Sequence, residues 1–436
     1  MDGHVTRLAA CLQALFTVTA ERLGRATKFI RRQRRLTASD FVRVLVFEWI
    51  GRPAATLESL AWHLPLSPQA LQQRLGPAAR AFLREMLAEA LRHLHRARPR
   101  PLGLLDRFTA VIVEDTTTIP LPAELAAEFP GCGGGGGGGE GAAALKVLVR
   151  WDVRSGEVQH LSVHSGRTSD QQLAAEAAAV PEGGLHLADQ GFFNTDRWRQ
   201  FRPGQFWISR VPARTQVDTG GWWQILADWL TDLDGPVADL SVRLVERTQL
   251  PCRIVARRCP QEVAARRKQK LREYTRDKKG RDPSAAQLAA CEWLVFATNV
   301  PAEMLDPVEL WVVYRCRWQI ELLFKRAKQI SGWGASSGRR GDRILVELYA
   351  KLLGLLVQHW ATLVRGGPVD GVSPTKLFRV VQEFAHRLAD DLTRSRDDLA
   401  DALHRLLCHL QRVRPQPTRT KKPSTRQLLL NPRLAA

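Results

Sequence analysis

The sequence lacks the cysteine patterns that would suggest a disulfide framework or a zinc site. Its seven cysteines are odd in number and scattered along 436 residues, with no Cys-x-x-Cys and no metal-ligand spacing. No arrangement of His or Cys indicates a covalent nucleophile either. The cysteines are Cys11, Cys132, Cys252, Cys259, Cys291, Cys316 and Cys408.

Long apolar runs are also missing, since we find no span of 18 apolar residues. Residues 8–20 resemble a signal-peptide core, but Arg7 is the only cation before them, and Arg22, Arg25 and Lys28 follow closely. We therefore expect an amphipathic helix in a cytoplasmic protein. Negative charge is scarce: 64 Lys and Arg stand against 44 Asp and Glu, a net charge of +20. This balance favours nucleic acid as the partner over a membrane surface.

Four residues near position 320 carry the strongest motif. Tyr314, Arg317, Glu321 and Lys328 are spaced so that one straight α-helix presents all four on a narrow stripe. A solvated helix face with an ordinary i,i+4 pair between Arg317 and Glu321 is the simpler alternative. A separate apolar face holds Val313, Cys316, Ile320, Leu323, Phe324 and Ala327.

The spacing Tyr-x2-Arg-x3-Glu-x6-Lys resembles the signature of the YREK-type insertion-sequence transposases, the IS-four-type branch of the DDE transposases. The resemblance implies an RNase H-like catalytic core in which Glu321 is the third metal-binding carboxylate. It implies two Mg²⁺ ions, with Mn²⁺ as a substitute, and a homodimer on double-stranded DNA. It also implies nicking, a hairpin on the element end and transfer into target DNA, with Tyr314, Arg317 and Lys328 on phosphates.

Two aspartates stand where such a site needs them. Residues 109–115 predict a short buried strand that delivers Asp115 at its carboxyl end. Residues 185–193 predict a second strand that delivers Asp189, followed by glycine and two aromatics. Taken singly, an Asp after an apolar strand is more often a turn or cap residue. Both segments resemble the family's motifs, and the order Asp115, Asp189, Glu321 is the family's order.

The first hundred residues are helical by pattern. Residues 56–75 predict helix, tight turn and helix, with Ser67 as N-cap and Pro68 in the first turn. An ordinary helical hairpin is an equal alternative to a DNA-binding one. The arginine cluster at residues 31–35 favours DNA, through phosphate contacts. The exposed part of the second helix would carry Gln69, Gln72, Gln73 and Arg74.

Strands dominate after residue 109. Two more are expected at 144–153 and 158–164, then a helix from Thr168 or Ser169 through Val180, and a strand at 206–211 that ends near Arg210. This order matches an RNase H-like core. The glycine tract at 133–139 predicts a mobile loop, because it has no side chains to pack and is costly to order. A phosphate cradle is the alternative, but no Lys-Ser/Thr follows the tract into a helix.

A β-rich insertion is expected at 215–290. It holds strand candidates at 241–248 and 252–258, then a basic segment at 266–281 that we expect to grip DNA backbone, with a solvated helix as the alternative. Trp293 lies in the next strand. The resemblance suggests that it stacks on a flipped base, whereas a buried core tryptophan is the alternative.

The signature helix is expected to begin with a capping box at Asp306 and to end at Gly332. Apolar-periodic helices follow at 342–364 and 372–412, and then a loose tail.

These features predict an α/β protein with an RNase H-like core, a β-rich insertion and all-α ends. Its function would be that of a DDE transposase, an enzyme for metal-dependent phosphodiester hydrolysis and strand transfer. A domesticated DNA-binding protein without activity and a cellular RNase H-like nuclease are the alternatives. The predicted divisions are a helical DNA-binding domain (1–105), the core's first part (106–214), the insertion (215–290), the core's second part (291–340), a helical region (341–412) and a basic flexible tail (413–436).

Overall fold

A computed structural model describes residues 2–32, 35–93, 101–132, 142–174, 180–334, 336, 338–365 and 371–435. The glycine tract at 133–139, the middle of the arginine cluster and residues 175–179 of the helix expected to reach Val180 lie outside these residues. The chain forms two compact units. The first comprises residues 1–101, 116–168 and 319–418, and the second comprises 102–115, 169–318 and 419–436. The domain boundaries expected from the sequence stay predictions.

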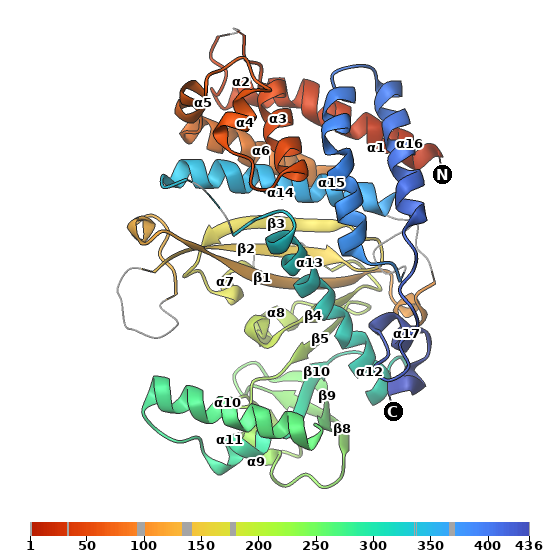
Figure 1. Cartoon of the computed structure of the whole chain (residues 1–436). Coiled ribbons are helices and arrows are strands. Elements are labelled where there is room, and N and C mark those ends of the chain that lie inside the picture. Colours follow the sequence, from red (N-terminus) through yellow and green to blue (C-terminus); the bar gives the residue numbers. More distant parts are fainter. Residues whose placement is uncertain are drawn as a thin grey trace. The chain divides into compact units, whose positions relative to one another are not determined.

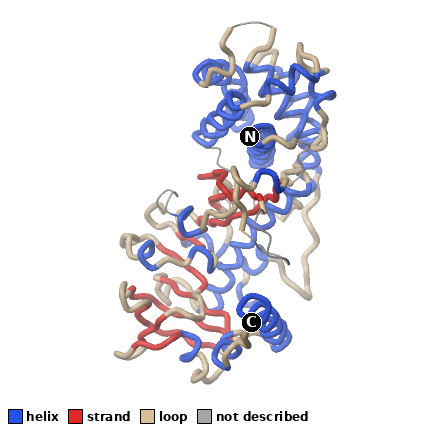
Figure 2. The backbone as a smooth tube through the Cα atoms, turned by 90° about the vertical axis from the view of Figure 1, so that its left-hand side faces the viewer, coloured by secondary structure: helices blue, strands red, loops and turns tan. Residues whose placement is uncertain are grey.

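Helices make up most of the first unit (Figure 1; Figure 2). The central one is α14 (Gly341–Leu363), which packs against α3, α6 and α15. The other helices are α1 (Asp2–Ala14), α2 (Ala20–Ala26), α3 (Ala38–Gly51), α4 (Leu57–Ala61), α5 (Pro68–Arg74), α6 (Pro77–Arg92), α13 (Trp318–Gln329), α15 (Pro374–Asp391) and α16 (Arg396–Arg412), with a π-helical turn at Leu15–Thr19 and a 3-10 turn at Ala123–Leu125.

Helix α14 is the apolar helix that was predicted at 342–364. By length and composition this helix could cross a membrane, although no such span was predicted. Its apolar window is entirely buried inside the protein, because α3, α6 and α15 cover it. Burial on all sides is what a core helix needs, and it explains the helix's apolar character.

The strands of the first unit form an antiparallel pair. Strands β2 (Ala143–Asp152) and β3 (Val158–Ser165) lie where two strands were predicted, and they pair with each other. The second half of β1 (Val111–Leu121) also belongs to this unit, and β1 is the neighbour of β2 in the sheet. The turn between β2 and β3 is stabilised by Asp152, whose carboxylate accepts from the backbone N–H of Arg154 at 3.0 Å.

The second unit contains the sheet that positions the site. Its strands lie in the order β1, β4 (Leu185–Ala188), β5 (Phe206–Arg210), β10 (Trp293–Thr298), β9 (Leu250–Arg258), β8 (Val237–Leu244), β6 (Gln216–Asp218) and β7 (Trp223–Ile225). β1, β4 and β5 are parallel to one another, and every later neighbour is antiparallel. Short helices α7 (Asp170–Ala174) and α8 (Thr195–Trp198) flank β4, with 3-10 turns at Gly103–Arg107 and Gln190–Phe192.

The region expected as a β-rich insertion is mixed. Besides β6 to β9 it contains α9 (Leu226–Trp229), α10 (Gln261–Lys279) and α11 (Ala285–Ala290). The strand expected at 241–248 ends at Leu244, because Val245 has φ +56° and starts the turn into β9. The basic segment is the second half of α10, whose left-handed C-cap is Gly280.

The C-terminal tail is ordered where loose chain was expected. Helix α17 (Thr425–Leu430) starts with a capping box at Ser424 and is followed by a 3-10 turn at Pro432–Ala435. Leu428 and Leu429 are buried, and α17 contacts α12 (Pro307–Tyr314). Burial of two leucines fixes this part of the tail.

Candidate active site

Three polar residues form a row across the parallel strands of the second unit. In β1 and β4, Val113 is the register partner of Leu187, so Asp115 and Asp189 lie level two residues further on. In β4 and β5, Ala188 pairs with Ser209, which places Arg210 level with Asp189. Both carboxylates thus come just beyond the point where the pairing of β1 with β4 stops.

Strand β1 is longer than predicted, so Asp115 is not at its end. β1 continues to Leu121, although its pairing with β4 stops at Val113. Threonines 116–118 and Ile119 are β-branched and suit an extended strand, and β1 continues through them. Asp189 does follow the last residue of β4, as predicted.

Arg317 lies between the two aspartates. Its Nη1 is 3.1 Å from Asp115 Oδ2, and its Nε is 3.9 Å from Asp189 Oδ1. The Arg317 side chain is only 13% exposed, compared with 20% for Asp115 and 35% for Asp189. Arg210 adds a second cation, with Nη1 4.0 Å from Asp189 Oδ1. One guanidinium therefore neutralises two carboxylates in a partly dehydrated place.

Tyr314 is buried and faces Asp189. Its hydroxyl donates to the backbone oxygen of Ala188 at 3.1 Å and to Asp189 Oδ1 at 3.4 Å, and its ring packs on Phe296. Burial and then the negative charge of Asp189 raise the pKa of Tyr314 above its usual range. The phenol is enclosed here and its hydroxyl is directed at Asp189, and the DNA contact expected for Tyr314 stays a prediction.

A buried ionic network beneath this row was not predicted. Glu114 precedes Asp115 in β1 and points to the opposite face, where it is fully buried. Arg197 binds its carboxylate through two nitrogens at 2.9 and 3.1 Å, and His186 Nε2 lies 3.5 Å away. Burial opposes ionisation, but His186 and Arg197 hold the pKa of Glu114 far below its usual range. A carboxylate inside an apolar strand run was the available sequence signal.

The signature residues do not share one straight helix. α12 begins with the predicted capping box at Asp306 and ends at Tyr314, a 3-10 turn covers Arg315–Arg317, and α13 follows. A 3-10 turn advances about 120° per residue instead of about 100°, so the predicted stripe is interrupted. Arg315 lies over the ring of Trp311, 5.1 Å from its centroid, at this turn.

Glu321 and Lys328 lie on α13 in the first unit. Glu321 is half-buried, and Lys328 Nζ donates to the backbone oxygen of Thr118 at 2.9 Å. Burial lowers the pKa of Lys328. Arg74 is exposed in the last turn of α5, in the helix pair whose Ser67 cap was predicted correctly. Within the described part of the chain, no three His, Cys, Asp or Glu side chains form a group that could hold a metal ion.

Trp293 lies in the predicted strand but is a core residue. Its side chain is 2% exposed, Arg258 covers the ring 4.6 Å from its centroid, and its backbone oxygen accepts from Arg267 at 2.7 Å. The base-stacking role suggested for it therefore lacks an accessible face. The strand pattern allowed both outcomes, because pairing with β9 and cover by α10 depend on distant residues.

Asp115 and Asp189 thus lie beside Arg210 and Arg317 in an α/β fold of a strongly basic chain. Comparison with known proteins identifies the family. The profile of the transposase DDE domain matches residues 106–357, which is more than half of the chain. The chain therefore belongs to the DDE transposase family.

Its relatives include transposases of insertion sequences over most of their length. It is 23% identical to the transposase for insertion sequence element IS231E of Bacillus thuringiensis subsp. finitimus, with 94% of this chain and 91% of the relative covered. It is 24% identical to the transposase for insertion sequence element IS1151 of Clostridium perfringens, covering 82% and 80%. A putative transposase, InsL of element IS186A from Escherichia coli (strain K12), is 32% identical over 24% of this chain and 28% of its own. This is an enzyme family of DNA transposition.

Proposed function

We propose that the chain cuts the ends of an insertion sequence and joins them to target DNA at one site made by Asp115, Asp189 and Glu321 in an RNase H-like core. The observation that carries this proposal is that Asp115 and Asp189, each two residues beyond the last register pair of β1 and β4, both lie within 4 Å of Arg317. The order β3-β2-β1 in the first unit and β1-β4-β5 in the second supports the RNase H-like assignment.

The donor set fits a divalent metal. Carboxylate oxygens are the ligands that Mg²⁺ prefers, and Asp115 and Asp189 already share one cationic partner at 3.1 and 3.9 Å. Glu321 on α13 would complete the set. When bound, Mg²⁺, or Mn²⁺ in its place, would stabilise charge on the attacking and leaving oxygens of the phosphodiester. The proposed site would hold two such ions.

The other side chains of the site would orient carboxylates and phosphate. The Tyr314 hydroxyl and the Glu114–Arg197 pair would hold Asp189 and β1 in place. Arg317 and Arg210 lie within 4.0 Å of Asp189, so they can turn from the carboxylates to the scissile phosphate. Lys328, which is exposed on α13, would add a further phosphate contact.

The reaction would proceed by successive phosphoryl transfers. Water would attack the phosphorus at the element end, which breaks the bond to the 3′-oxygen and leaves a free 3′-hydroxyl. That hydroxyl would attack the phosphorus on the opposite strand and displace the 3′-oxygen of the flanking DNA, which forms a hairpin on the element end. Water would then attack the hairpin phosphorus and release the 3′-hydroxyl of the element end. Within a homodimer on the two ends, that 3′-hydroxyl would finally attack a phosphorus of target DNA and displace the 3′-oxygen of the target strand.

Two surfaces would bind DNA outside the site. The pair α4–α5 exposes Gln69, Gln72, Gln73 and Arg74, with Trp62 76% exposed beside them. The outer side of α10 exposes Arg272, Arg276 and Lys279. Such cations bind phosphates and release counterions. The place of action would be the bacterial nucleoid in the cytoplasm.

The experiment uses the full chain, Mg²⁺ and labelled duplexes that carry the inverted repeats flanking its gene. Asp115→Asn, Asp189→Asn and Glu321→Gln should each abolish cleavage while DNA affinity changes less than about threefold. The controls Asp234→Asn and Glu303→Gln change exposed acids away from the row and should cleave normally. Normal cleavage by any of the first three variants would remove that residue from the proposed site.

The same assay separates the two rival functions. A domesticated DNA-binding protein would bind the repeats and leave them uncut. A cellular nuclease would cut unrelated duplex as fast as element ends and yield no hairpin. Either outcome with the unchanged protein would replace the proposed function.

A further inference from the structure

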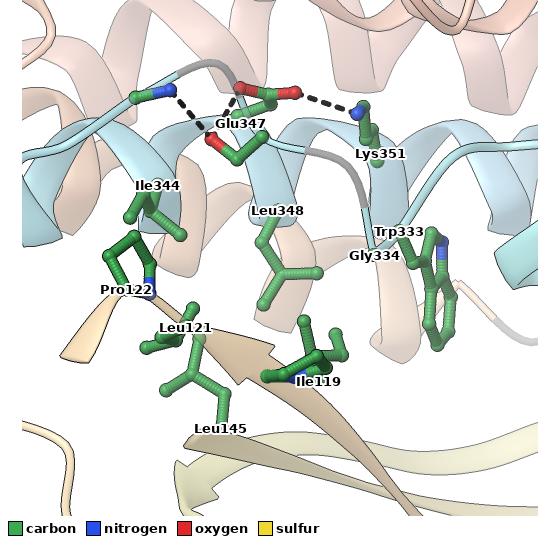
Figure 3. Close-up of a pocket in the computed structure, with 13 residues that line it drawn as sticks. Ile119, Leu121, Pro122, Leu145, Trp333, Gly334, Ile344, Glu347, Leu348 and Lys351 are labelled. Carbon is green, nitrogen blue, oxygen red and sulfur yellow. Dashed lines mark hydrogen bonds and ion pairs between the residues drawn. The ribbon is translucent and has the colours of Figure 1, made fainter. Parts of the chain in front are cut away.

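A buried lysine fixes the chain just beyond the acidic helix α13. Lys351 on α14 donates from Nζ to the backbone oxygen of Gly332 at 2.9 Å and pairs with Glu347 at 2.7 Å. Figure 3 shows this ion pair beside Trp333 and Gly334, with Ser336 donating to the other oxygen of Glu347 at 2.9 Å. A cation near the final carbonyls of a helix stabilises the helix end.

This ion pair is almost inaccessible to solvent. The Lys351 side chain is 2% exposed and that of Glu347 is 10% exposed. Buried ion pairs contribute little net stability, because dehydration offsets their attraction, so their use points to a need for defined geometry. The segment that follows α13 is therefore held in one position.

The same lysine contacts the N-terminal helices. Its Nζ lies 5.9 Å from the centroid of the Trp49 ring, near the end of α3. Gly332 has φ +62°, and a Cβ at that position would lie 3.3 Å from the Cβ of Pro53. Residues 49–53 form the end of α3 and the start of the connection to α4. The chain after α13 therefore packs on the segment that leads into the α4–α5 pair.

A second side chain makes the same connection from α15. Gln382 Nε2 donates to the backbone oxygen of Ile50 at 3.1 Å and to that of Ile330 at 3.3 Å. One amide thus ties the end of α3 to the end of α13. Two independent side chains join the same two segments, and all these residues belong to the first unit.

We propose that Lys351, together with Gln382, is a positioning residue that couples the α4–α5 pair to α13, so that DNA bound by α4–α5 sets the position of Glu321. The inference rests on the proposed function, which gives Glu321 its catalytic part. Lys351 acts through the backbone oxygen of Gly332, just beyond the end of α13, and touches no substrate.

The test compares turnover with affinity in the full chain. The pair variant Lys351→Met/Glu347→Gln removes both charges and leaves no unpaired ion. We expect kcat for end cleavage to fall about tenfold or more with KM and DNA affinity unchanged. Lys351→Arg should retain most activity, because a cavity of about 180 Å³ beside the pair leaves room for a guanidinium. Gln382→Met should repeat the kcat loss without altering the buried charges.

The matched control is the ion pair between Arg80 and Asp342, which also ends on α14, at 3.0 Å. Arg80→Met/Asp342→Asn should leave kcat unchanged, and melting temperatures show whether each variant is folded at the assay temperature. Unchanged kcat in folded Lys351→Met/Glu347→Gln or in Gln382→Met would overturn the proposal.

A double-mutant cycle tests the coupling itself. Gln72→Ala/Gln73→Ala changes exposed residues of α5 and should lower kcat in the native background but not in the Lys351 pair variant. Additive losses would show that Lys351 has only a structural role. A Glu321→Gln arm separates the two proposals: if that variant cleaves, the proposed function fails, and if it is inactive while the Lys351 and Gln382 variants are normal, only the coupling fails.

Discussion

Replacement of Arg317 by methionine should destabilise the second unit and make its stability depend on Mg²⁺. The change removes a cation that lies 3.1 Å from Asp115 and 3.9 Å from Asp189, and methionine keeps much of the apolar stem. A hydrogen bond to a charged group contributes about 1.5–3 kcal/mol, and the two level carboxylates then also repel each other. For a unit of this size, that loss lowers the melting temperature by roughly 3 to 10 °C.

The assay is thermal unfolding of native and Arg317→Met protein in EDTA and in Mg²⁺. Loss of the competing guanidinium leaves two carboxylates to bind the metal, and a ligand that binds only the folded state stabilises it. We expect Mg²⁺ to raise the melting temperature of Arg317→Met more than that of the native chain. Arg243→Met is the control, since it breaks an ion pair with Asp218 in the same unit but away from the row.

Two results would refute this reasoning. An unchanged melting temperature in EDTA would mean that Arg317 does not neutralise the aspartates in solution. An equal response of Arg317→Met and Arg243→Met to Mg²⁺ would mean that Asp115 and Asp189 do not share a metal.

Three further predictions follow from burial and charge. Trp293→Ala should cost about 3–5 kcal/mol of stability, because the ring is buried, and it should reduce the nicked and hairpin products together. Loss of the hairpin product alone, on gels that resolve the two, would instead support the stacking role. Arg272→Gln/Arg276→Gln/Lys279→Gln should reduce the magnitude of the slope of log K against log [salt] by up to about 2.7, at about 0.9 for each lost phosphate contact. An unchanged slope would show that α10 does not contact DNA phosphates. Burial lowers the pKa of His359 to about 4 from 6.5. The stability that neutral His359 contributes to the folded state is therefore complete above pH 6.5 and is lost as the pH falls toward 4. Between about pH 7 and about pH 5, the melting temperature should therefore fall more steeply for the native protein than for His359→Gln. Equal pH dependence of the two melting temperatures would show that His359 is not held neutral by burial.

Local features of the fold were predictable because a few neighbouring residues determine them. The Ser67 cap of α5 and the Asp306 capping box of α12 depend on hydrogen bonds within three residues. Asp189 follows β4 because a short apolar run before a glycine indicates a strand end.

Features that depend on distant partners were missed. Threonines 116–118 suit a turn as well as a strand, and only their place beside β2 extends β1 through them. Leu428 and Leu429 order the tail because α12 covers them. The Arg197 and His186 partners of Glu114 come from separate segments, so no local pattern shows them.

The central claim is that Asp115, Asp189 and Glu321 form one metal-binding site, and exchange of each carboxylate for a thiolate tests it most directly. Asp115→Cys, Asp189→Cys and Glu321→Cys should each lose end cleavage in Mg²⁺ and regain part of it in Mn²⁺, because a thiolate ligand prefers the softer ion. Rescue of all three variants is the predicted result. Cleavage by any of them in Mg²⁺, or failure of Mn²⁺ to rescue Glu321→Cys while it rescues both aspartate variants, would contradict a shared three-carboxylate site.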